Sequence, residues 1–123
     1  MADSPDEMME VLGDRIAETY IGLGMICANL PVPIELPTGV VNARTLTAAV
    51  RRVSEIAEDQ PMPEEQVAGL FTASILYLAA LDLLGMLQHN PYEESRAAGA
   101  LGVLVLAQEN LKDLAEWLAA DDS

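Results

Sequence analysis

The sequence predicts an all-α protein, an antiparallel four-helix bundle with an extended, proline-rich strap between the first and second helices. Apolar residues recur at the three- and four-residue spacing of helical faces along most of the 123 residues. Aromatic residues make up only 4% of a chain that is 51% hydrophobic, so the core must consist of aliphatic side chains and methionines, a composition that suits helices better than strands. Proline, which ends helices, clusters between the periodic stretches.

The first helix is predicted over residues 5–30. Ser4 can cap it, Pro5 suits the first helical position, and Glu7 completes a capping box. Its apolar stripe advances in steps of three and four residues through Met9, Leu12, Ile16, Tyr20, Leu23, Cys27 and Leu30. Pro31 then ends the helix.

Residues 31–41 form the predicted strap. Three prolines within seven residues exclude a helix and favour extended geometry. A solvated linker would be polar, but this segment also contains Val32, Ile34, Leu36, Val40 and Val41. We therefore expect an ordered segment that lies across the bundle.

Three further helices complete a single domain over residues 1–123. They are predicted over residues 42–58, 63–88 and 91–119. Asn42 can cap the second helix, and Asn90 followed by Pro91 can start the fourth. The short connections between these helices indicate antiparallel neighbours.

The charge balance limits the possible partners. Twenty acidic residues against six basic ones give a net charge of −14. Direct binding of nucleic acid is not expected, because phosphate contacts need a basic footprint, and a basic protein partner is the charged partner that the sequence favours. The first ten residues are acidic and lack the basic start of a secretory signal. With a single cysteine, Cys27, no internal disulfide can form, and we expect a cytoplasmic protein.

The third predicted helix is long and apolar enough to suggest a membrane span. Between Val67 and Leu87 its only charge is Asp82, which would cost ~3 kcal/mol near the centre of a bilayer. Its flanks are acidic and give no positive-inside signal. We therefore expect no membrane span, and instead a helix buried inside the bundle or against a second copy.

Self-association is predicted through the third and fourth helices. The third helix has almost no charged outward stripe, and the fourth has one only after Gln108. We expect a homodimer, because an exposed apolar face of this size would otherwise aggregate. The small residues that would let a second copy approach the fourth helix are Ser95, Ala98, Gly99 and Gly102. Alternatively, this groove receives another helix of the same chain.

No motif in the sequence indicates catalysis, a metal or a cofactor. One histidine, His89, and one cysteine cannot form the zinc or di-iron clusters that need several such ligands. Gly22 and Gly24 lie inside a periodic helix without a preceding strand, so they do not form a nucleotide-binding loop. The sequence names no catalytic residue, and it favours a protein that is not an enzyme while leaving activity open.

The first functional hypothesis is a non-catalytic interaction protein, such as an accessory subunit, an adaptor or a small chaperone. The strap or the small-residue groove of the fourth helix would meet the partner, and acidic residues would steer a basic one. The candidate acidic surface follows one side of the first helix at Glu7, Glu10, Asp14 and Glu18. The same four carboxylates, spaced like successive phosphates, also suggest an acidic DNA-mimic inhibitor, although an ordinary solvated helix face is the simpler explanation.

The second hypothesis is a small-molecule-binding bundle or a ligand-handling enzyme. Its pocket would lie between helices around Asp82, a single carboxylate among leucines. The other candidate lining residues are Met25, Leu36, Tyr77 and Leu78. Asp82 could instead pair with an arginine, or belong to a narrow solvated stripe with Gly85 and His89.

Overall fold

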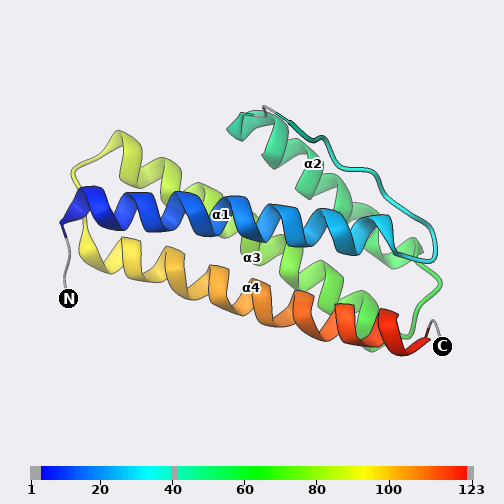
Figure 1. The fold of residues 1–123 in the computed structure, drawn as a ribbon. Helices are drawn as coiled ribbons and strands as arrows, with labels where there is room; N and C mark the ends of the chain where they lie inside the picture. The colour runs from blue at the N-terminus through cyan, green and yellow to red at the C-terminus, as the bar shows by residue number, and fades with distance from the viewer. Residues whose placement is uncertain (1–3, 40–41, 122–123) are drawn as a thin grey trace.

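The computed structural model describes residues 4–39 and 42–121, and the regular secondary structure within them is all helical (Figure 1). The helices are α1 (Pro5–Ala28), α2 (Ala43–Ile56), α3 (Glu64–His89) and α4 (Glu94–Asp121), with a short 3-10 turn, η1 (Ala57–Asp59), after α2. The described residues contain no strand. The prediction of an all-α protein with four packed helices is confirmed.

Local capping explains where the first two helices begin. The Ser4 hydroxyl accepts a hydrogen bond from the Glu7 amide at 3.2 Å, with Pro5 in the first turn. The Asn42 side chain accepts one from the Thr45 amide at 2.9 Å. In each case a short polar side chain satisfies an amide that has no partner inside the helix.

Two predicted helix ends differ from the structure. The first helix ends at Ala28 rather than at Leu30, with Asn29 as its cap. The fourth begins at Glu94 rather than at Pro91. The Asn90 side chain does not cap it, because its amide donates backwards to the Met86 carbonyl at 2.9 Å and so closes the end of α3.

The core lies between α3 and its neighbours. α3 packs most extensively against α4 and also against α2 and α1, whereas α1 and α2 do not pack against each other within the described residues. Fully buried side chains come from each of the three long helices. They include Leu12, Leu23, Leu70, Tyr77, Leu104 and Leu114.

The connection between α1 and α2, residues 31–39, is held to the helices on both sides. The buried side chains of Ile34 and Leu36 belong to the core. The Ile34 amide donates to the Cys27 carbonyl at 2.9 Å. Val40 and Val41, which the sequence analysis placed in the same segment, lie outside the described residues.

α3 is less buried than the sequence suggested. Its most apolar 18-residue window has a mean hydropathy of 1.9, but only 33% of that window is buried inside the fold. By length and composition alone the helix could cross a membrane. Within one copy, α3 is therefore not the fully enclosed central helix that we expected, and its outer side remains exposed.

Candidate functional site

An apolar groove of about 710 Å³ runs between α1 and the 31–39 connection. Tyr77 of α3 and Leu46 at the start of α2 complete its lining. Among the described lining residues the only charged side chain is Glu35. α1 contributes one side of its surface, made largely of small and apolar residues, with Gly13, Ile16, Ala17, Tyr20, Ile21, Gly24, Met25 and Ala28.

Two tyrosines fix the inner part of this groove. The Tyr20 hydroxyl donates to the Pro37 carbonyl at 2.6 Å and thereby ties α1 to the connection. The buried Tyr77 hydroxyl donates to the Ile16 carbonyl at 3.1 Å. The two rings are tilted by 33°, with centroids 6.2 Å apart. Burial raises the pKa of both hydroxyls, so both remain protonated hydrogen-bond donors at neutral pH.

The structure brings together three of the five predicted ligand-binding residues. Leu36 and Tyr77 are buried in the groove lining, and Met25 is 65% exposed beside them. Leu78 is half-buried and does not line the groove.

Asp82 does not lie in this groove, so a pocket around Asp82 is not what the structure shows. Its side chain is exposed on α3. Five residues separate it from Tyr77, which corresponds to about 140° of rotation around a helix. The groove-facing tyrosine and the carboxylate therefore point in different directions. Asp82 lies on a solvated side with His89, which is also exposed.

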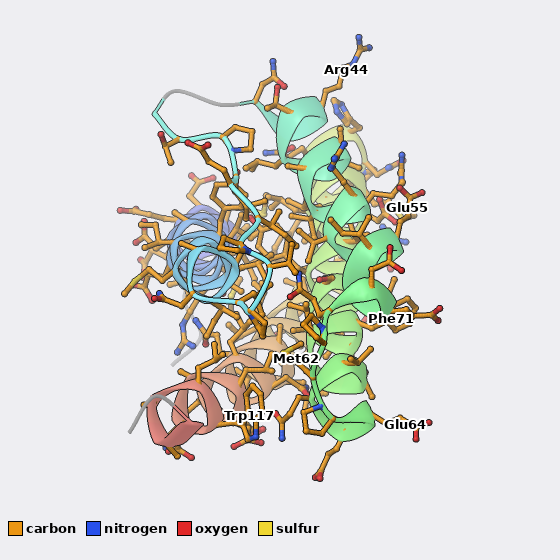
Figure 2. The ribbon with its side chains drawn as sticks, turned by 90° about the vertical axis from the view of Figure 1, so that its right-hand side faces the viewer. Arg44, Glu55, Met62, Glu64, Phe71 and Trp117 are labelled. Carbon is orange, nitrogen blue, oxygen red and sulfur yellow. The ribbon has the colours of Figure 1, made fainter. Side chains whose placement is uncertain are left out.

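A second groove, of about 1100 Å³, lies between the connection and α2. It is lined by charges of both signs, with Arg44, Arg52, Glu35, Glu55 and Asp59. Figure 2 shows Arg44 and Glu55 projecting outwards from α2. Sequence reasoning missed this groove, because helical spacing alone does not show where the connection passes.

The four acidic candidates on α1 are all exposed. Glu7, Glu10, Asp14 and Glu18 lie on the solvent side of the helix. Exposure is what a partner surface, a phosphate mimic and an ordinary solvated face all require.

The small residues of α4 face solvent. Ser95, Ala98, Gly99 and Gly102 are exposed, and a Cβ atom at Gly99 or Gly102 would meet no described atom within 4 Å. α4 instead packs inside the chain through Ala97, Ala100, Leu104 and Ala107, which are buried. The alternative that this groove receives another helix of the same chain is therefore wrong.

The side chains with chemical reactivity are either isolated or buried. No group of three or more His, Cys, Asp or Glu among the described residues could hold a metal ion. Cys27 is buried, and desolvation raises the pKa of its thiol to about 12. A thiol in this state is a poor nucleophile, so Cys27 acts as a small core residue.

Comparison of the chain with protein-family models, with curated proteins and with solved structures gives no match in any of the three. Its function must therefore be argued from its own surfaces. Two of them stand out, the apolar groove beside α1 and the outer sides of α3 and α4.

Proposed function

We propose that this chain is a non-catalytic interaction protein of the cytoplasm, an accessory subunit, adaptor or small chaperone that works as a homodimer. In this proposal the four helices form an antiparallel bundle, and residues 31–41 lie across it as a strap. The two copies meet through the outer sides of α3 and α4. The supporting observation is that these sides are apolar, carry little charge and are exposed in a single copy.

We call the exposed apolar and small residues of these two helices the α3–α4 face. Ile75, Met86 and Leu106 are 41, 45 and 51% exposed. Gly99 and Gly102 lie on the same helix as Leu106 with open space around them. Exposed apolar patches of this kind mark interaction sites. Figure 2 shows Phe71, a further exposed apolar residue of α3, pointing outwards.

The occupant that we propose for this face is a second copy. At a net charge of −14, two copies repel each other wherever their acidic surfaces meet. The α3–α4 face limits this repulsion, because between residues 67 and 87 α3 has a single charge, Asp82, which is exposed on the same side of the helix as Ile75 and Met86. Glycines would let the two backbones approach closely, as small residues do in other helix pairs.

A bilayer is a less suitable occupant of the same face. Asp82 lies within the apolar stretch, and inserting a carboxylate near a bilayer centre costs ~3 kcal/mol. Exposed Glu64, Glu65, Glu93 and Glu94 flank the ends of α3. These acids are unfavourable beside anionic lipid headgroups.

The substitution Gly102→Glu tests the dimer without a built-in folding defect. The site has no described atom within 4 Å of a Cβ, and glutamate has a helix propensity better than that of glycine by up to about 1 kcal/mol. We expect the wild-type protein to sediment as a dimer and the variant as a monomer, with a dissociation constant raised at least about tenfold.

Gly13→Glu is the matched control, because Gly13 is also an exposed helical glycine with open space, but on α1. It adds the same charge and should leave the dimer intact. A monomeric wild-type protein would contradict the proposal, as would equal weakening by the two substitutions. Partition of the wild-type protein into phosphatidylcholine vesicles would favour the membrane alternative instead.

A small-molecule-binding function is the second candidate. One observation favours it: Met25, Leu36 and Tyr77 line the same groove of about 710 Å³, a volume within the usual range for such sites, roughly 300–1,000 Å³. Asp82 has no part in this version. A constant extra mass on the wild-type protein that is absent from the Ile21→Glu variant would support the small-molecule-binding function.

A further inference from the structure

We propose that the groove between α1 and the 31–39 connection is the docking site for an amphipathic helix of a partner protein. The apolar side of that helix would lie in the groove, and basic residues would flank it. This inference rests on the proposed interaction function and names the chemistry of the partner. It concerns a different surface from the α3–α4 face, so the two can fail separately.

The length of the groove suits a helix better than a compact ligand. Its lining on α1 extends from Gly13 to Ala28, which at 1.5 Å per residue is about 22 Å, or four helical turns. A drug-sized molecule would leave part of this apolar wall exposed. Small residues recur along it at Gly13, Ala17 and Gly24, and they let another helix approach the α1 backbone.

Beside the groove, α1 has no packed helical neighbour within the described residues, because its helical contacts are with α4 and α3. α2 has 14 residues, whereas α1, α3 and α4 have 24, 26 and 28. Figure 1 shows α2 above the half of α1 that is nearer its C-terminal end. α1 and α2 do not pack against each other among the described residues, so an added helix in the groove would give α1 a further neighbour on the side away from α4.

The charges around the groove select a basic partner. Glu35 is the only charged residue among the described lining residues. Asp14 and Glu10 lie on the same side of α1 as Ile21 and Ala17, because each is three or four residues from the next towards the N-terminus. Both carboxylates are exposed. The connection thus contributes one carboxylate to the groove, and two more follow on α1 beyond its Gly13 end. Lysine or arginine beside the apolar stripe of a partner would pair with them, which would mainly set orientation and association rate.

A model peptide tests this directly by calorimetric titration. The probe is an amphipathic leucine–lysine peptide of about 15 residues, the length of four helical turns. Its control is a peptide of the same composition with the amphipathic order scrambled. We expect the amphipathic peptide to bind the wild-type protein at least about tenfold more tightly than the scrambled peptide.

Ile21→Glu and Val11→Glu form a matched pair of variants on α1. Ile21 lines the groove and is 62% exposed; Val11 is 43% exposed and does not line it. Neither belongs to the packed core, so both variants should fold. Both add one negative charge and so attract a basic peptide equally. We expect Ile21→Glu to weaken binding at least about tenfold and Val11→Glu to change it less than about threefold.

Three results would overturn the inference. Equal affinity for the two peptides would mean that only charge attracts them. Equal effects of the two substitutions would place binding on another surface. Binding of a neutral apolar dye that Ile21→Glu abolishes and the peptide does not displace would assign the groove to small molecules. None of these results affects the sedimentation of the wild-type protein and the Gly102→Glu variant, which tests the dimer alone.

Discussion

Gln60 fastens the 31–39 connection, and its replacement should loosen one wall of the groove. Its buried side chain contacts both backbone groups of Val32: Oε1 accepts from the Val32 amide at 3.0 Å, and Nε2 donates to the Val32 carbonyl at 2.6 Å. The substitution Gln60→Met keeps the length of the side chain and removes both hydrogen bonds.

The expected loss of stability follows from these two bonds. Each contributes about 1 kcal/mol net. Because Val32 is exposed, its freed backbone groups can turn to water, and the buried methionine recovers some apolar burial. We expect the free energy of unfolding to fall by about 1–2 kcal/mol. With an unfolding entropy of about 2.1 cal/mol/K per residue, the melting temperature should fall by about 4–8 °C.

Urea and thermal unfolding followed by circular dichroism would measure the change. Hydrogen exchange at the Val32 and Ile34 amides would show whether the connection itself has loosened. Gln88→Met is the control, since Gln88 is exposed on α3 and its substitution should change stability by less than about 0.5 kcal/mol. If Gln60→Met proved as stable as Gln88→Met, the two hydrogen bonds would not hold the connection.

Two further predictions concern buried polar groups. Tyr77→Phe removes the hydrogen bond to the Ile16 carbonyl and should lower the free energy of unfolding by about 1 kcal/mol in urea titrations; an unchanged value would show that this bond contributes nothing. Burial raises the pKa of the Cys27 thiol from 9.0 to about 12, so with rising pH this thiol ionises in the unfolded chain before it ionises in the folded one. The free energy of unfolding should therefore fall as the pH rises from 9 towards 12. The wild-type slope should exceed that of Cys27→Ala by up to about 1.4 kcal/mol per pH unit, and equal slopes would contradict the buried thiol.

The sequence predicted which segments form helices, because helix formation depends on local patterns of residues. The caps at Ser4 and Asn42 and the apolar spacing of α1 are all visible within a few residues of sequence. Asn90 shows the limit of such reasoning. Its side chain could close the preceding helix or open the next, and both choices satisfy local rules; the structure uses it at the end of α3.

The candidate site was only partly predictable, because periodicity shows which residues share a helix face but not which elements meet. Leu36 and Tyr77 were recognisable as apolar residues, but their meeting depends on the path of the connection. Asp82 drew attention as a lone carboxylate in an apolar run. Sequence could not decide whether that run was enclosed, and the structure leaves the outer side of α3 exposed.

Native mass spectrometry of the wild-type protein, purified gently from its own cells, would report the number of copies and any retained ligand together. A protein that acts through interactions between its own copies should appear at twice the chain mass of 13.2 kDa, without a constant small-molecule adduct. A single chain carrying a constant extra mass would contradict the homodimer and favour the ligand-binding groove.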